Sequence, residues 1–214
     1  KQLASVRRLP KPTGKDDVIK TIRVLASDPK KYNCNTFVVD TADALDRILA
    51  SEVCRESGVD SLERAAGGYG KGYKRVDTFW KMILQELDSL ISANVMVVIL
   101  GHTSPVEFVD PEAGAYNRWV PRMDKKLEHG GSLIIEWADV VGFAHRPVKS
   151  RAPDGTVGVS TATGPGRTKS IPQSSGDRQL RLVGTPAVLA KNRYSVGAET
   201  CNLDWPSLAA LLFS

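Results

Sequence analysis

Apolar residues recur with the period of an amphipathic helix in several segments of the chain. In "DDVIKTIRVLASD" the residues Val18, Ile22 and Leu25 fall on one helical face. The same period runs through "ADALDRILASEVCRES", which Gly58 ends, and through "VDTFWKMILQELDSLISA". The last segment, "LDWPSLAALLFS", is predicted to be a closing helix. The chain is therefore expected to contain several amphipathic helices.

Two short segments between these helices are almost wholly apolar. They are "NTFVVDT" at residues 35–41 and "VMVVILGHTS" at residues 95–104. Such runs fit strands that are buried on both faces, as in a parallel sheet. Further strands are predicted around residues 140–144, in "RQLRLVG" and in "AVLAKNRY". The alternation of strands and helices predicts an α/β fold whose sheet is parallel in its first half.

The composition is that of an ordinary soluble domain, with 214 residues and a formal net charge of +5. Cys34, Cys54 and Cys201 are scattered without a C-x-x-C pair, which argues against a zinc site or a disulfide framework. A reducing cytoplasm is therefore expected. No apolar run is long enough to span a membrane, and the first residues lack the apolar core of a signal peptide.

The pair Gly14-Lys15 in "KPTGKDDVIKT" raises the question of a phosphate-binding loop. The G-x-x-x-x-G-K-[ST] spacing is not met, because Leu9 stands at the first glycine position and Asp16 at the Ser/Thr position. We interpret the segment as the entry to a helix that Thr13 or Asp16 caps.

Polar residues follow the ends of three predicted strands, where ligands bind in such sheets. Asp40, which Thr41 follows, could hold Mg²⁺ beside a nucleotide. Alternatively, Asp40, Thr41 or Asp43 could cap the next helix. His102 could contact a terminal phosphate, order a water molecule or serve as a structural hydrogen-bond partner. Lys191 and Arg193 alternate along a strand, which suits a phosphate clamp as well as two solvated cations.

Two basic stretches interleave cations with aromatic residues, a pattern suited to unpaired nucleic acid. The alternative is that the glycine-rich stretch is only a flexible loop and that Trp119 of the other stretch packs inside the fold. The segment at residues 147–177, rich in Gly, Pro, Ser, Thr and basic residues, is predicted to be a mobile loop. The two stretches are "GGYGKGYKR", with Tyr69, Lys71, Tyr73, Lys74 and Arg75, and "EAGAYNRWVPRMDKK", with Tyr116, Arg118, Trp119, Arg122, Lys125 and Lys126.

The ordered set "FVVDT", "GYGKGY", "VVILGHTS", "EWADVVGFAHR", "LAKNRYSV" and "LDWPSL" resembles the phage-encoded RecA-like P-loop ATPases of the single-strand-annealing and recombination group. The resemblance runs from about Lys11 to the C-terminus. It implies one RecA-like ATPase core over residues 1–214, with a mostly parallel central sheet flanked by helices and with late antiparallel strands.

The resemblance also implies roles for the strand-end residues. Asp40 would lie in the Walker B strand near Mg²⁺, directly or through water, with Thr41 beside the nucleotide. His102 would be the sensor of the γ-phosphate. Lys191 and Arg193 would act on the ATP of a neighbouring subunit. The stretch "GGYGKGYKR" would be the first DNA-binding loop, and the segment from about Thr103 to Lys126 would be the second.

The chain departs from the family in lacking a Walker A motif before Asp40. We expect an N-terminally incomplete core, inactive by itself in ATP hydrolysis; a naturally ATP-dead protein is the alternative. The intact protein is expected to be a DNA-stimulated ATPase that needs ATP and Mg²⁺ and promotes recombination or strand annealing. Its expected partners, in the cytoplasm of a bacterial host, are single-stranded DNA, further copies of itself and a phage single-strand-binding protein. A non-catalytic annealing module with a vestigial ATP site and a RecA-fold helicase-type motor remain alternatives.

Overall fold

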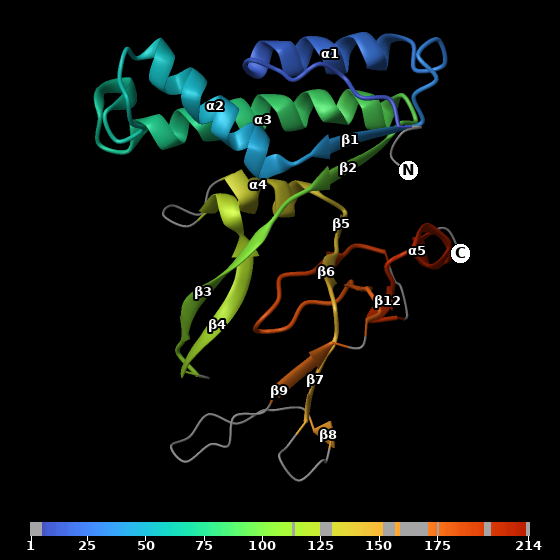
Figure 1. Ribbon diagram of the computed structural model, residues 1–214. Helices are drawn as coiled ribbons and strands as arrows, with labels where there is room; N and C mark the ends of the chain where they lie inside the picture. The colour runs from blue at the N-terminus through green and yellow to red at the C-terminus, as the bar shows by residue number, and fades with distance from the viewer. Residues whose placement is uncertain are drawn as a thin grey trace. The chain divides into compact units, whose positions relative to one another are not determined.

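The chain is mixed α/β, and its structure is a computed structural model (Figure 1). The described residues are 6–112, 114–124, 130–151, 157–158, 171–174, 176–194 and 198–212. The chain divides into two compact units, each described by itself. Unit 1 comprises Lys1–Val106 and Trp119–Trp137, and unit 2 comprises Glu107–Arg118 and Ala138–Ser214. The prediction of a single ATPase core over the whole chain stays a prediction.

Unit 1 holds the helices and the two strands that the apolar periodicity predicts. The long helix α3 is central, because α1, α2 and α4 all pack against it. Short 3-10 turns η2 and η3 precede α3 and α4. The elements are α1 (Lys15–Ser27), β1 (Thr36–Asp40), α2 (Ala42–Glu56), η2 (Ala65–Gly67), α3 (Lys71–Ser92), β2 (Met96–Leu100), η3 (Arg122–Asp124) and α4 (Gly130–Trp137).

Strands β1 and β2 pair in parallel, which confirms the predicted direction of the first two strands. Thr36 lies opposite Met96, and Asp40 lies opposite Leu100. The expected burial on both faces is wrong for these strands, since Val38 is 46% exposed. Its neighbours Phe37 and Val39 pack against the core instead. Successive strand residues point to opposite faces, and the helical core covers only one of them.

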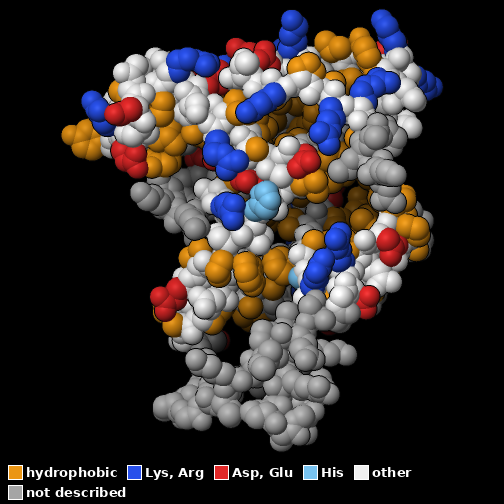
Figure 2. Space-filling model, viewed as in Figure 1, with side chains coloured by type: hydrophobic (Ala, Val, Ile, Leu, Met, Phe, Trp, Pro, Cys, Tyr) orange, Lys and Arg blue, Asp and Glu red, His pale blue; other side chains and the backbone are white. Residues whose placement is uncertain are grey.

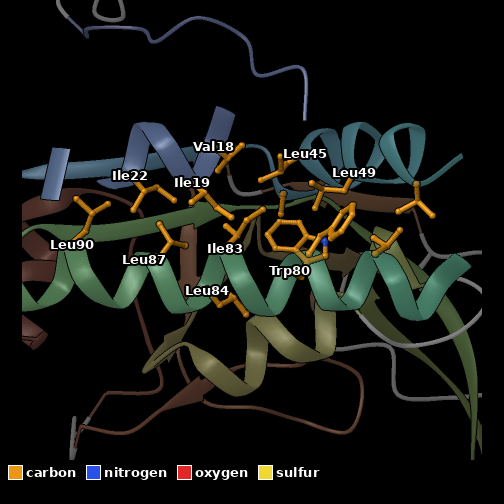
Figure 3. Packing of buried hydrophobic residues seen from close by; sticks show 14 of the residues in the cluster. Val18, Ile19, Ile22, Leu45, Leu49, Trp80, Ile83, Leu84, Leu87 and Leu90 are labelled. Atoms are coloured by element: carbon orange, nitrogen blue, oxygen red, sulfur yellow. The ribbon is translucent and has the colours of Figure 1, made fainter. Parts of the chain in front are cut away.

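The core of unit 1 is the interface between α3 and the helices around it. Side chains spaced three and four residues apart along α3 form a continuous buried stripe, as an amphipathic helix requires. Figure 3 shows residues of α1 and α2 pointing toward this stripe. The fully buried residues of α3 are Phe79, Trp80, Ile83, Leu87 and Leu90, and those of α1 and α2 are Ile22, Leu49 and Val53.

The Glu52 carboxylate of α2 accepts a hydrogen bond from the first residue of α1. The main-chain N–H of Lys15 donates to Glu52 Oε2 at 2.6 Å, and Lys15 Nζ lies 3.5 Å from Glu52 Oε1. A Cβ at Gly14 would lie 2.8 Å from Glu52 Oε2, so glycine permits this close approach. The expected capping by Thr13 or Asp16 is wrong: the N-cap is Gly14, without a side-chain cap.

The stretch "GGYGKGYKR" is a loop only in its first half, which corrects the prediction. Gly70, with φ of 73°, is the N-cap of α3, and the residues from Lys71 onward are helical. A Cβ at Gly72 would lie 2.2 Å from the carbonyl oxygen of Leu62. The missing side chain therefore lets the start of α3 pack directly on the preceding backbone.

The chain after β2 forms a β-hairpin that the sequence pattern does not predict, β3 (Thr103–Asp110) with β4 (Gly114–Pro121). The remaining elements belong to unit 2, where all described strand pairs are antiparallel. They confirm the late strands and the closing helix. They are β5 (Val140–Val141), β6 (Phe143–His145), β7 (Val148–Arg151), β8 (Val157–Gly158), β9 (Ile171–Ser174), β10 (Gln179–Arg181), β11 (Lys191–Asn192), β12 (Thr200–Asn202) and α5 (Trp205–Leu212).

The mostly parallel sheet is not confirmed, since β1–β2 is the one parallel pair among the described strands. In unit 2, β10 lies between β6 and β12, β5 pairs with β11, and β7 lies between β8 and β9. The predicted mobile loop at 147–177 thus contains strands, while 152–156, 159–170 and 175 lie outside the described residues. Within the described part of the chain, no helix combines the length and apolarity needed to cross a membrane.

Replacing Glu52 tests the contact that starts α1. In Glu52→Ala, the Lys15 N–H loses its acceptor in a half-buried place, so urea unfolding should show a loss of about 2 kcal/mol. The matched control is Glu56→Ala, one turn further along α2, where the side chain is 42% exposed and lies 3.8 Å from Arg75. That variant should lose less than about 0.5 kcal/mol. Equal losses in the two variants would contradict the role assigned to Glu52.

Candidate functional site

The carboxyl ends of β1 and β2 lie side by side because the strands are parallel. Asp40 is the last residue of β1 and lies opposite Leu100, the last residue of β2. Thr41 follows β1 directly, and His102 lies two residues beyond β2. The structure therefore brings the predicted Asp40, Thr41 and His102 to one edge of a parallel pair, the place where such sheets bind ligands.

Thr41 confirms the capping alternative for its own side chain. Its backbone is extended, and its hydroxyl oxygen accepts a hydrogen bond from the N–H of Ala44 at 3.3 Å. The peptide bond between Asp40 and Thr41 is cis. Asp40 is exposed at the end of its strand, so α2 is capped without burying the Asp40 carboxylate. One exposed carboxylate at a strand end fits a Mg²⁺ site completed by phosphate oxygens and water.

Asp43, in the first turn of α2, is the residue that holds His102. The main-chain N–H of His102 donates to Asp43 Oδ1 at 3.2 Å. The ring nitrogen Nδ1 of His102 lies 3.0 Å from Oδ1 and 3.1 Å from Oδ2. The Asp43 side chain is 6% exposed and that of His102 is 58% exposed. The pair thus links a buried carboxylate to a ring that reaches solvent.

Hydrogen bonds keep the buried Asp43 carboxyl group ionised. Burial is the largest single influence and raises its pKa, but the His102 ring, the His102 main chain and the Thr41 hydroxyl all favour the charged form. Together these hydrogen bonds lower the pKa of Asp43 to about 2. Arg47, one turn along α2, adds a cation 3.7 Å from Asp43 Oδ2.

Sequence reasoning missed the contact between Asp43 and His102. The sequence indicates Asp43 only as a helix cap, because its partner lies 59 residues away in the chain. The available signal was its position in the first turn after the strand that ends at Asp40. The structure also supports the structural alternative for His102, because its ring Nδ1 lies 3.0 Å from Asp43 Oδ1.

The first predicted DNA loop contributes one exposed cationic face at the start of α3. Lys71, Lys74 and Arg75 are exposed and share a helical face by their spacing. Tyr69 in the preceding turn is 99% exposed. Arg75 is partly engaged, because its guanidinium lies 3.8 Å from Glu56 and 4.9 Å from the centre of the Phe79 ring. Tyr73 donates its hydroxyl to Glu63. Across the helical unit, Figure 2 shows many Lys and Arg side chains at the surface.

The second predicted DNA loop is largely the β3–β4 hairpin. Arg118 donates to the Tyr116 hydroxyl at 2.9 Å and to the carbonyl oxygen of Pro186 at 2.8 Å. Its guanidinium also lies 4.0 Å from the centre of the Phe108 ring. Trp119 is 41% exposed and, by strand alternation, faces away from Arg118. Arg122 is exposed in η3, while Lys125 and Lys126 lie outside the described residues.

Lys191 and Arg193 lie in unit 2, at β11 and just after it. Lys191 is opposite Val141 of β5. Arg193 forms an ion pair with Asp139 at 2.8 Å, and its N–H donates to the Asp139 carbonyl oxygen at 3.0 Å. The predicted action of both cations on a neighbouring subunit therefore stays a prediction. Among the described residues, no three His, Cys, Asp or Glu side chains form a metal-binding group.

The low pKa of Asp43 predicts a specific acid sensitivity. Because the pKa is lower in the folded chain than its usual 3.8, ionised Asp43 stabilises the fold above about pH 4. This contribution, about 2 kcal/mol, is lost as the pH falls from about 4 to about 2. Urea unfolding between pH 6 and pH 2 should show a correspondingly smaller acid loss in Asp43→Asn. Asp60→Asn, at a carboxylate whose side chain is 80% exposed, should retain the full loss. An unchanged pH dependence in Asp43→Asn would contradict the assignment.

Comparison with protein-family models matches residues 3–194 to a family described as an AAA domain. Neither the curated proteins nor the solved structures yielded a match to this chain. The match covers most of the chain and is consistent with a P-loop NTPase. An AAA domain implies nucleotide binding, usually with Mg²⁺, which agrees with the exposed polar residues at the ends of β1 and β2. On this match the chain belongs to the AAA-domain family.

Proposed function

We propose that the protein is an ATP-dependent, single-stranded-DNA-binding protein of the RecA-like type that promotes phage recombination or strand annealing. Membership of the AAA-domain family supports a nucleotide-dependent activity. The observation that carries the nucleotide part is the meeting of Asp40, Thr41 and His102 at one edge of the β1–β2 pair. In such folds this edge is where phosphates and their metal ion are bound.

Asp40 is proposed to hold Mg²⁺, directly or through a water molecule. When bound, the Mg²⁺ ion of ATP would neutralise charge on the phosphates. Thr41 starts α2 beside it, so the helix N-terminus adds a favourable potential for anions. His102, whose side chain is 58% exposed, would reach the terminal phosphate or the water that attacks it.

Single-stranded DNA is proposed to contact the start of α3 in unit 1, and the β-hairpin is a separate candidate surface. The support is the exposure of Lys71, Lys74 and Arg75 beside the exposed ring of Tyr69. Cations neutralise the phosphate backbone, and exposed aromatic rings stack on unpaired bases. Trp119 would offer a second ring on the hairpin.

The protein is also proposed to act as a homo-oligomer. Lys191 and Arg193 would stabilise the phosphates of ATP bound to a neighbouring copy of the chain. The ion pair between Arg193 and Asp139 is exposed, with side chains that are 54% and 55% exposed. Such a pair costs little to exchange for a phosphate. Hydrolysis would then depend on assembly.

A second candidate is an annealing module without catalysis. It is favoured by the start of α1, where "TGKDD" lacks the spacing of a phosphate-binding loop. The Lys15 N–H there, which could meet an anion, already donates to Glu52. A helicase-type motor is the third candidate, and displacement of a duplex strand by the full-length protein would favour it.

Hydrolysis of ATP by the full-length protein, with and without single-stranded DNA, tests the leading proposal. DNA should raise the rate. Asp40→Ala should lower the DNA-stimulated rate at least about 100-fold, because the metal loses its protein ligand. Asp60→Ala, at an exposed carboxylate of the same unit, should leave the rate unchanged. Absence of DNA-stimulated hydrolysis in the parent would overturn the ATPase proposal, and annealing that persists without ATP would favour the second candidate.

Removing the cations at the start of α3 tests the DNA surface. The triple variant of Lys71, Lys74 and Arg75 to Ala should weaken binding of a labelled single strand, followed by fluorescence anisotropy. It should also reduce the slope of log affinity against log salt by about 2, since each phosphate contact on a single strand contributes about 0.7.

The matched control for this variant replaces Lys20, Lys30 and Lys31, three exposed lysines of α1 and the turn after it. It removes the same net charge from another part of unit 1. Its affinity should fall much less, and its salt slope should stay the same. Similar losses in both triple variants would show that only the total charge matters.

A further inference from the structure

The contact between Asp43 and His102 fixes a side chain in one orientation. The carboxylate receives both the main-chain N–H and the ring Nδ1 of His102, at 3.2 Å and 3.0 Å. The backbone and the ring of His102 are therefore held by the same buried group. Since Nδ1 is turned toward Asp43, the other ring nitrogen, Nε2, lies on the side of the ring away from the carboxylate. The exposed part of the His102 side chain, 58% of its surface, then offers Nε2 to a ligand.

The ionisation state of Asp43 determines which nitrogen of His102 carries the hydrogen. With its pKa lowered to about 2, the Asp43 carboxylate is ionised at neutral pH. An ionised carboxylate only accepts hydrogen bonds, so Nδ1 must donate. In the neutral ring Nε2 then carries a lone pair. The cation beside the pair is Arg47, which lies on the Asp43 side, 3.7 Å from Oδ2. The main-chain N–H of Arg122 donates to the main-chain carbonyl oxygen of His102.

We propose that His102 accepts a proton from the attacking water through Nε2, and that Asp43 is the positioning residue that keeps the hydrogen on Nδ1. This inference rests on the proposed ATPase function and adds a water-activating pair to it. A neutral Nε2 accepts a hydrogen bond from a water O–H but has no hydrogen to donate to an anionic phosphate oxygen. Between the two functional roles predicted for His102, the geometry favours ordering water over sensing phosphate.

The step conserves atoms and charge. The water oxygen forms a bond to the terminal phosphorus, and the bond from that phosphorus to the bridging oxygen breaks, so ADP leaves with the electron pair. The proton released by the water passes to Nε2, and the resulting imidazolium is stabilised by the ionised Asp43. His102 then returns the proton to solvent. The products are ADP, inorganic phosphate and a proton.

Nitrogen-15 NMR of the histidine rings tests the positioning role without any need for catalysis. In the full-length protein at the pH of the ATPase assay, His102 should show a protonated Nδ1 and an unprotonated Nε2, with its signals identified by their loss in His102→Gln. In Asp43→Asn the side chain can donate as well as accept, so both neutral forms should be populated. A parent protein with Nε2 protonated, either as the other neutral form or as the imidazolium, would overturn the proposal.

Two substitutions of His102 separate water activation from phosphate sensing. His102→Glu supplies another proton acceptor and should keep kcat for DNA-stimulated hydrolysis within about tenfold of the parent. His102→Arg supplies a permanent donor to phosphate and should lower kcat about 100-fold, the usual size of a lost general base. The opposite order, with activity kept by His102→Arg and lost in His102→Glu, would overturn the proposal.

The positioning role of Asp43 is tested by a double-variant cycle. Asp43→Asn should lower kcat about tenfold and leave KM for ATP within about twofold, because substrate binding does not use the carboxylate. In a His102→Ala background the same change should alter kcat less than about twofold. A full tenfold loss in that background would show a merely structural role. Asp60→Asn, at a carboxylate of the same unit whose side chain is 80% exposed, is the matched control and should equal the parent in ring protonation and kcat.

The two proposals fail in different ways. If the parent shows the expected ring protonation but hydrolyses no ATP, the Asp43–His102 pair stands and the ATPase function fails. If the parent hydrolyses ATP but Nε2 carries the hydrogen, the function stands and the assigned role of His102 fails. Should Asp43→Asn not fold, the ring spectrum of the parent and the two His102 substitutions still decide the question.

Discussion

The parallel backbone pairing of β1 with β2 is the interaction on which the candidate site depends. Because the two strands run in the same direction and end at Asp40 and Leu100, the groups that follow them meet at one edge. A parallel pair needs a long crossover, and α2 and α3 supply it. Helix α3 also provides much of the buried core of unit 1. The packing that holds this crossover in place therefore also aligns the strand ends at the candidate site.

Helix α2 carries two buried carboxylates, Glu52 and Asp43, which bind different polar groups of unit 1. Glu52 accepts the first N–H of α1 and shields it, so the segment that most resembles a phosphate loop in sequence is satisfied within the chain. Asp43 instead holds His102, whose ring is largely exposed. The main-chain N–H of Lys15 is therefore already engaged within the chain, while the ring of His102 at the end of β2 reaches solvent.

The basic residues of the chain differ in how far they are committed to internal contacts. Arg118 is held between two aromatic rings and a main-chain carbonyl oxygen, which gives the hairpin a fixed cationic position. Lys71 and Lys74 extend from the first turn of α3 into solvent. Arg193 is paired with Asp139 on the surface of unit 2.

The local sequence determined the helices α1, α2 and α3 and the strands β1 and β2. It also determined that α2 ends just before Gly58, whose φ is 63°. Apolar periodicity and glycine act over only a few residues of the chain. The tertiary structure decided what depends on partners distant in the chain. Helix α3 begins inside "GGYGKGYKR", which the sequence predicts to be a loop. Gly72 lets the helix backbone pack closely on Leu62 there. Strands β3 and β4 form a hairpin that the sequence does not predict. Asp43 meets His102 across 59 residues, and Lys15 meets Glu52 across 37. The apolar periodicity of a single segment cannot predict these contacts, because they form only when the packed core brings distant segments together.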